Sequence, residues 1–140
     1  MSIARLEDAK KVPTLDPSKA ENGFLFELFK DGDKTAVYIS ATKPGMFKGY
    51  HLHRVRAARY VCIKGKMKIT LYQNGKKEEY ILDAQNPQRL FIPNNVATGL
   101  LNIGEEEAWL INYPDPPYDP NLKDEQVEYT EEELEKGVVK

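Results

Sequence analysis

Residues 44–53 read PGMFKGYHLH, and this stretch holds both histidines of the 140-residue chain, His51 and His53. A segment rich in strand-forming residues follows it. Successive side chains of a β-strand point to opposite faces, so residues i and i+2 share one face, about 6.5 Å apart. The spacing therefore predicts two imidazoles that enter one pocket, as in a metal site or an acid/base site.

Strand patterns continue on both sides of this stretch. In 66–72, Met67, Ile69 and Leu71 alternate with polar residues. Turn residues recur about every 8–12 positions, as in an all-β sandwich or barrel, and no strand–helix alternation is present. The predicted strands cover 24–29, 35–40, 48–54, 58–63, 66–72, 77–82, 88–93, 98–103 and 107–113.

The length favours a single domain. Within it we expect a polar N-terminal arm at 1–22, which pairs with a sheet edge or a partner, and a barrel at 23–113. Residues 114–140 are expected to form a proline-rich loop over the barrel and a short docked helix at 131–136. The acidic run 124–135 is interpreted as a solvated face.

Composition excludes several classes of function. The net charge is −2, with no basic field for nucleic acid and no polybasic run for a membrane surface. No apolar stretch approaches the ~18 residues of a membrane span, and no signal core is present. The single cysteine, Cys62, cannot form an internal disulfide and lies in an apolar alternation, so we expect it in the core. A cytoplasmic protein is therefore expected.

Two segments resemble the motifs of the cupin superfamily. The first runs from Pro44-Gly45 through His51 and His53 to Gly65, and the second from Pro93 to Asn102. The resemblance implies a jelly-roll β-barrel or sandwich. Metal cupins carry a glutamate and a third histidine at the positions of Ala58 and Thr98. Two imidazoles alone are a poor site for a catalytic divalent ion, so we expect neither a metal nor another cofactor.

Within cupins, the chain is more similar to epimerases and ketoisomerases of dTDP-4-keto-6-deoxy sugars, including dTDP-4-dehydrorhamnose 3,5-epimerase. The similarity covers about residues 23–130 and is carried by 43–53, 61–65, 90–99 and 117–120, with 124–125 downstream. It implies a homodimer, formed through exchanged or augmenting N-terminal strands, that binds a nucleotide sugar.

Epimerisation or keto transfer next to a ketone needs a base, a stabiliser of the enolate oxygen and an acid. The resemblance implies that His51 is the base and that His53 orients substrate or acts as a second base. Lys48 matches a diphosphate contact. Tyr118 matches the acid, with Tyr113 as the second choice. The further candidates for substrate binding are Arg56, Arg59, Thr98 and Asn102.

Ala58 stands where the 3,5-epimerases carry a lysine. Arg56 or Arg59 could replace that cation, although strand alternation places Arg59 on the outer face if Ala58 points inward. The leading hypothesis is a metal-independent epimerase or ketoisomerase of surface polysaccharide biosynthesis. One alternative is a catalytically silent cupin that binds a carbohydrate or sugar nucleotide, and another is a metal-dependent cupin enzyme. The nucleotide, the sugar and the ring carbon stay open.

Overall fold

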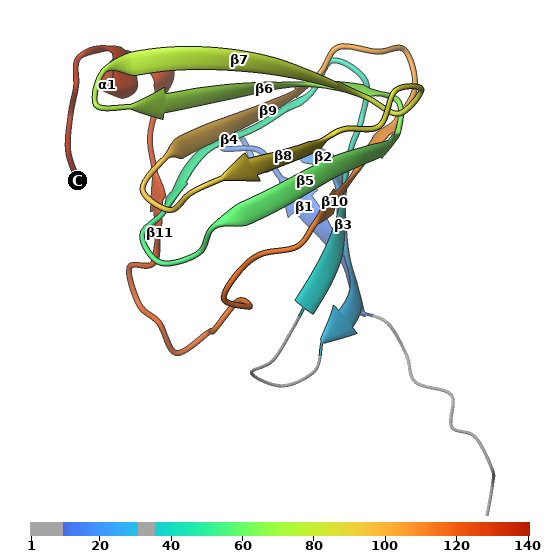
Figure 1. Ribbon diagram of the computed structural model, residues 1–140, viewed down its shortest axis with the longest axis horizontal. Coiled ribbons are helices and arrows are strands. Elements are labelled where there is room, and N and C mark those ends of the chain that lie inside the picture. The colour runs from blue at the N-terminus through green and yellow to red at the C-terminus, as the bar shows by residue number, and fades with distance from the viewer. Residues whose placement is uncertain (1–9, 31–35) are drawn as a thin grey trace, which may run out of the picture.

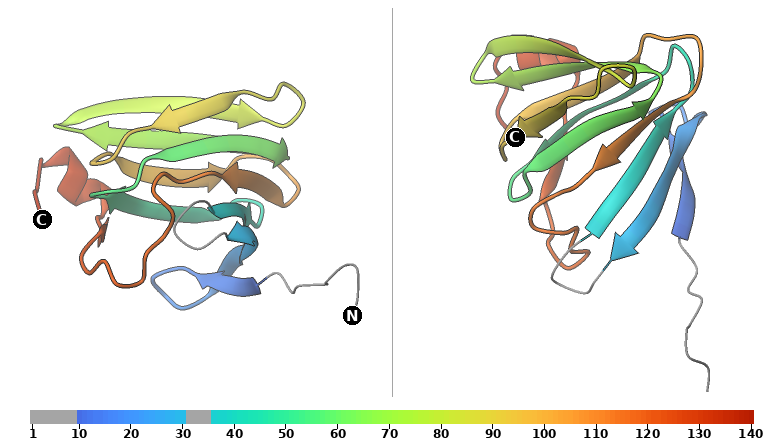
Figure 2. Two further views of the ribbon diagram at one scale, coloured as in Figure 1. Left: turned by 60° about the horizontal axis from the view of Figure 1, so that its bottom comes forward. Right: turned by 45° about the vertical axis from the view of Figure 1, so that its right-hand side comes forward.

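The computed structural model describes residues 10–30 and 36–140, which form two antiparallel sheets that face each other (Figures 1 and 2). One sheet has the order β1-β2-β3-β10-β5-β8, and the other has the order β11-β4-β9-β6-β7. The strands are β1 (Lys10–Leu15), β2 (Glu21–Lys30), β3 (Ala36–Thr42), β4 (Phe47–His53), β5 (Ala58–Lys64), β6 (Lys66–Gln73), β7 (Lys76–Asp83), β8 (Arg89–Ile92), β9 (Ala97–Asn102), β10 (Ala108–Asn112) and β11 (Gln126–Glu128).

The all-β prediction is confirmed, because each of the nine predicted strands corresponds to a strand in one or the other of the two sheets. Two further strands come from segments outside the predicted barrel. β1 pairs with β2 along 10–15 and so extends the edge of its own sheet. β11 pairs with β4, with Gln126 opposite His53 and Glu128 opposite His51. Residues 1–9 of the predicted arm lie outside the described residues.

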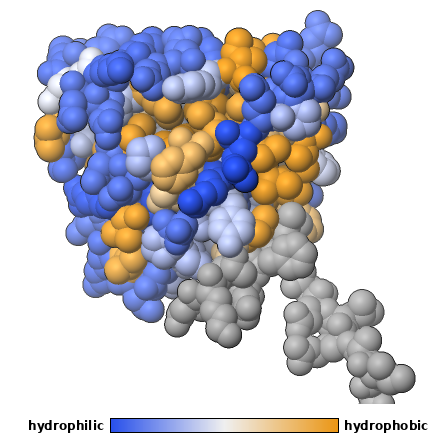
Figure 3. Space-filling model, viewed as in Figure 1, coloured by the Kyte–Doolittle hydropathy of each residue, from blue (hydrophilic) through white to orange (hydrophobic). Residues whose placement is uncertain are grey.

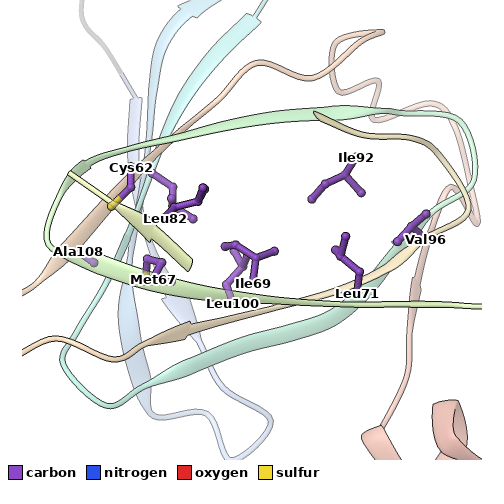
Figure 4. Packing of buried hydrophobic residues seen from close by; sticks show 10 residues of the cluster. Cys62, Met67, Ile69, Leu71, Leu82, Ile92, Val96, Leu100 and Ala108 are labelled. Atoms are coloured by element: carbon purple, nitrogen blue, oxygen red, sulfur yellow. The ribbon is translucent and has the colours of Figure 1, made fainter. Parts of the chain in front are cut away.

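The core lies between the sheets and follows the alternation of β6. Met67, Ile69 and Leu71 point inward, where they pack with Leu82, Leu100 and other buried side chains (Figure 4). Cys62 is 1% exposed and belongs to this cluster, as predicted, and burial raises the pKa of its thiol. The thiol therefore acts here as a small apolar group.

Ile69→Ala is expected to lower the free energy of unfolding by about 2–5 kcal/mol, because Ile69 is fully buried and its loss leaves a cavity. Urea titration of both proteins measures the difference. Ile81→Ala is the matched control, since Ile81 is 56% exposed and its replacement should cost below about 0.5 kcal/mol. Equal losses in the two variants would contradict this assignment of the core.

A second, smaller cluster attaches the C-terminal helix α1 (Glu131–Glu135) to the outside of the five-stranded sheet (Figure 1). Leu134 of α1 packs with Tyr50, Tyr72 and Tyr129. A capping box begins this helix: Thr130 Oγ1 accepts from the Glu133 backbone N–H, and the Glu133 carboxylate accepts from the Thr130 N–H. This docking stabilises a helix that is too short to persist alone.

The outward face of the six-stranded sheet carries apolar side chains, which gather over β3 and β10 in Figure 3. Ile111 of β10 lies between Ile39 of β3 and Val61 of β5. Their chain neighbours face the interior, as strand alternation requires. Within residues 10–30 and 36–140, no helix has the length and apolar character needed to cross a bilayer.

Candidate functional site

A cavity of about 390 Å³ opens between the two sheets, next to the apolar core. Small-molecule sites commonly have volumes of about 300–1,000 Å³. Its walls carry both predicted histidines and several other polar groups. The lining residues are Val12, Thr14, Leu25, Tyr38, Ser40, Lys48, His51, His53, Arg56, Ala58, Tyr60, Ile92, Pro93, Val96, Thr98, Leu100, Asn112, Tyr118 and Gln126.

An irregularity at Gly49 lets β4 present three candidate site residues to this cavity. Lys48 and His51 are three residues apart and would face opposite sides of a regular strand. The register with β9 shifts between them, and Gly49 has a φ of +128°. A Cβ at Gly49 would lie 2.6 Å from the Thr98 carbonyl oxygen, so only glycine fits. As a result Lys48, His51 and His53 all line the cavity.

His51 lies at the inner face of β4, where burial lowers the pKa of its imidazole. Glu128 opposes this shift, and its carboxylate lies 3.7 Å from His51 Nε2, but its side chain is 78% exposed. Lys48 and Arg56 lower the pKa further. The imidazole is therefore neutral at pH 7 and can accept a proton.

His53 contacts a buried ion pair that the sequence did not indicate. Glu125 Oε1 lies 3.1 Å from His53 Nδ1 and accepts from Arg56 Nε at 2.9 Å. Glu125 Oε2 accepts from the backbone N–H groups of Val55 and Arg56. The Glu125 side chain is 6% exposed, so the prediction that the whole acidic run is solvated was wrong at this residue.

Burial alone would raise the pKa of the Glu125 carboxyl. The backbone N–H and the guanidinium of Arg56 outweigh burial and lower that pKa to about 2. The pKa of His53 is also lowered, first by burial and then by the positive charge of Arg56, although Glu125 opposes both. The group is therefore a carboxylate and a guanidinium beside a neutral imidazole.

Lys48 supplies a cation on the same wall of the cavity. Its Nζ donates to Ser40 Oγ at 3.1 Å and to the Ala41 carbonyl at 2.7 Å. Burial lowers the pKa of the Lys48 ammonium to about 8, although Glu107 opposes the shift. Lys48 and His51 also line a neighbouring hollow of about 670 Å³ between the end of β1 and residues 128–131.

Three tyrosines line the cavity, and only one of them was predicted. Tyr118 is half-exposed at its mouth, with the Arg56 guanidinium 5.1 Å from the ring centroid. The loop that carries it is held at Ala57, directly before β5, by reciprocal backbone hydrogen bonds between Asp115 and Ala57. Tyr38 and Tyr60 enter from β3 and β5, and burial raises the pKa of Tyr60 to about 12.

Thr98 and Arg56 line the cavity, but three other candidates do not. Arg59 lies over the Phe91 ring, 4.9 Å from its centroid, on the outer face that alternation from Ala58 predicts. Asn102 is fully buried and bonds the backbone of Thr42, Glu106 and Gly104, so it holds a turn. Tyr113 is exposed and lies outside the cavity.

Two antiparallel sheets around a cavity, with paired histidines on one strand, define a cupin-type β-sandwich. The family described as "Polysaccharide biosynthesis C-terminal domain" matches residues 18–126. The chain belongs to this family.

Two curated relatives cover most of the chain. The probable low-salt glycan biosynthesis epimerase Agl13 of Haloferax volcanii is 29% identical over 130 residues, which cover 83% of each chain. The spore coat polysaccharide biosynthesis protein SpsL of Bacillus subtilis is 27% identical over 131 residues, covering 85% of this chain and 87% of SpsL.

Among solved structures, the capsular polysaccharide assembling protein CapF from Staphylococcus aureus is similar in fold. The TM-score is 0.71 and the identity is 21%, over 84% of this chain. The match spans only 34% of the CapF chain, so the similarity concerns one part of a longer protein.

The residues of this site do not fit the divalent metal that many cupins bind. Ala58 and Thr98 line the cavity where the metal-binding glutamate and histidine of such cupins would stand. Glu125 is engaged by Arg56 and two backbone N–H groups, and the guanidinium lies 3.0 Å from His53 Nδ1. Among the described residues, no three His, Cys, Asp or Glu side chains form a group that could hold a metal ion.

Proposed function

We propose that the protein is a metal-independent epimerase or ketoisomerase that acts on a nucleotide-linked 4-keto-6-deoxy sugar in surface polysaccharide biosynthesis. The observation that carries this proposal is the pair of neutral imidazoles beside a lysine in one cavity between the sheets. The family description and the names of Agl13 and SpsL support a role in polysaccharide biosynthesis, and the name of Agl13 supports epimerisation.

In the proposed reaction, His51 removes a proton from the ring carbon next to the ketone. The electron pair of the C–H bond forms an enolate, whose negative charge collects on the ketone oxygen. A tyrosine then returns a proton to carbon. In an epimerase the proton reaches the opposite face of the same carbon. In a ketoisomerase it reaches the former ketone carbon, while the hydroxyl on the first carbon becomes the new ketone and passes its proton to the enolate oxygen. Tyr118 keeps the role predicted for it, and Tyr38 is a second phenol in the cavity.

The proposed substrate spans both hollows. The sugar occupies the cavity between the sheets, and the diphosphate meets the Lys48 ammonium, which borders both spaces. Asn112 also lines the cavity, and its Oδ1 is buried without a hydrogen-bond partner among the described residues. A sugar hydroxyl would satisfy this acceptor, since buried polar atoms are nearly always hydrogen-bonded.

Solvent exchange tests the proposed function. The purified protein is incubated in deuterated water with a panel of 4-keto-6-deoxy sugars linked to different nucleotides, and NMR follows the ring protons. We expect deuterium at a carbon next to the ketone for at least one substrate. Absence of label across the panel, together with measurable binding, would favour the catalytically silent alternative.

Lys48→Arg should change the alkaline side of the pH profile. Because the pKa of Lys48 is about 8, the wild-type kcat/KM should fall as the ammonium loses its proton above that pH. Arginine stays charged above pH 12, so the fall should move beyond pH 10 in the variant. The acid side, where His51 becomes protonated below its usual range, should not change. An unchanged alkaline limb would contradict the assignment of Lys48.

A further inference from the structure

The arrangement around His53 Nδ1 bears on where the ring carries its proton. Nδ1 lies 3.1 Å from Glu125 Oε1, which can only accept, and 3.0 Å from Arg56 Nη2, which can only donate. One ring nitrogen cannot serve both neighbours. With a proton on Nδ1 it bonds to Glu125, and without one it accepts from Arg56.

The other contacts of the two neighbours favour acceptance. Glu125 already receives three hydrogen bonds, from Arg56 Nε and from the backbone N–H groups of Val55 and Arg56. The guanidinium can only donate, so a proton on Nδ1 would face an N–H of a cation 3.0 Å away. The lone pair of Nδ1 makes this contact attractive.

We infer that Arg56 holds His53 as the neutral tautomer with its proton on Nε2, and that this N–H donates a hydrogen bond to the substrate ketone oxygen as the enolate forms. Nε2 lies across the ring from the buried ion pair, and His53 lines the cavity. This inference rests on the proposed function, and it deepens it by separating the two histidines. His51 takes the proton from carbon, while His53 keeps its own proton.

In this role His53 replaces the lysine that the 3,5-epimerases carry at the position of Ala58. A developing oxyanion needs a preorganised donor, and a neutral N–H fixed in the wall of the cavity can supply it. No proton crosses from His53. In an epimerase the transfers are from carbon to His51 and from the acid to carbon, and in a ketoisomerase the neighbouring hydroxyl also passes its proton to the enolate oxygen. The buried Glu125 acts as a positioning residue, because it fixes the guanidinium that selects the tautomer.

NMR of the resting wild-type protein tests the tautomer without any substrate. A long-range ¹H–¹⁵N spectrum distinguishes a protonated ring nitrogen from one with a lone pair. Because the chain has two histidines, His51→Asn leaves only the signals of His53 and completes the assignment. At pH 7 we expect protonated Nε2 and unprotonated Nδ1. A proton on Nδ1, or an imidazolium, would overturn the inference even if the enzyme is active.

Two variants test the donor role in the exchange assay. His53→Gln keeps an N–H donor and should retain kcat within about tenfold, whereas His53→Leu should lose about 10²–10³ in kcat with little change in KM. The acid limb of the pH profile should be the same in His53→Gln as in wild type. Equal losses in both variants, a shifted acid limb, or full activity of His53→Leu would overturn the role. Absence of exchange by wild type would instead count against the proposed function, and the tautomer would stand.

Discussion

His51→Asn should abolish deuterium exchange, with a loss of about 10³-fold or more in kcat. Asparagine is close in size to the imidazole but cannot accept a proton at neutral pH, and a positioned base contributes about 10²–10⁴ in rate. Exchange into the substrate that the wild type labels best measures the effect. The fold should persist, because His51 is partly exposed and the Glu128 carboxylate near it is exposed as well.

Tyr113→Phe serves as the control for this variant. Tyr113 is an exposed aromatic residue that lies outside the cavity, so exchange should equal that of the wild type. If His51→Asn keeps more than about a tenth of the wild-type rate while His53→Leu does not, the base has been assigned to the wrong histidine.

Glu125→Ala should lower the free energy of unfolding by about 3–5 kcal/mol, the usual cost of removing one partner from a buried ion pair. Arg56 and the backbone N–H groups of Val55 and Arg56 would lose their acceptor. Denaturant titration at pH 7 measures the loss. The matched control is Glu132→Gln, because the pair of Glu132 with Lys136 is exposed and should contribute at most about 0.5 kcal/mol.

The same carboxylate should make the stability of the protein depend on pH. The pKa of Glu125 falls from 4.5 to about 2 on folding, so its contribution is present above pH 4.5 and is lost as the pH falls toward 2. The difference corresponds to about 3 kcal/mol. Glu125→Gln should lack this part of the acid dependence. A variant as acid-sensitive as wild type would contradict the assigned pKa.

The fold could be predicted because short apolar alternations and turn residues repeat along the chain. Two strands were not predicted as strands, although the arm that contains β1 was expected to pair with a sheet edge or a partner. Their sequence signals were weak. β1 contains Pro13 and polar residues, and β11 has only three residues. Both lie at sheet edges, where pairing with a neighbouring strand defines the element more than its own residues do.

Within the site, local spacing located the pair on β4 but not the residues that surround it. His51 and His53 are two positions apart, so alternation alone predicts a shared face. Glu125 lies 72 positions from His53 in an acidic segment, and nothing in that segment distinguishes a buried carboxylate from a solvated one. Alternation also does not tell which end of the sandwich stays hollow, so Tyr38 and Tyr60 were missed.

The partners of the arginines could not be predicted from local sequence either. Arg54, Arg56 and Arg59 form one basic cluster in the sequence, yet each has a different partner. Arg54 bonds the backbone of Asp124 and Lys140, Arg56 pairs with Glu125, and Arg59 stacks on an outer aromatic ring. Of these three partners, only the outward position of Arg59 was indicated by the sequence, because side chains alternate along β5 and Ala58 points inward.

The central claim is that His51 removes a proton from a sugar held in the cavity between the sheets. A crystal structure with a bound, unreactive analogue of a 4-keto sugar nucleotide tests it most directly. We predict that the carbon next to the carbonyl position lies about 3–3.5 Å from a nitrogen of His51, with the carbonyl oxygen toward His53 and the diphosphate beside Lys48. A sugar bound outside this cavity, with neither histidine in contact, would contradict the account.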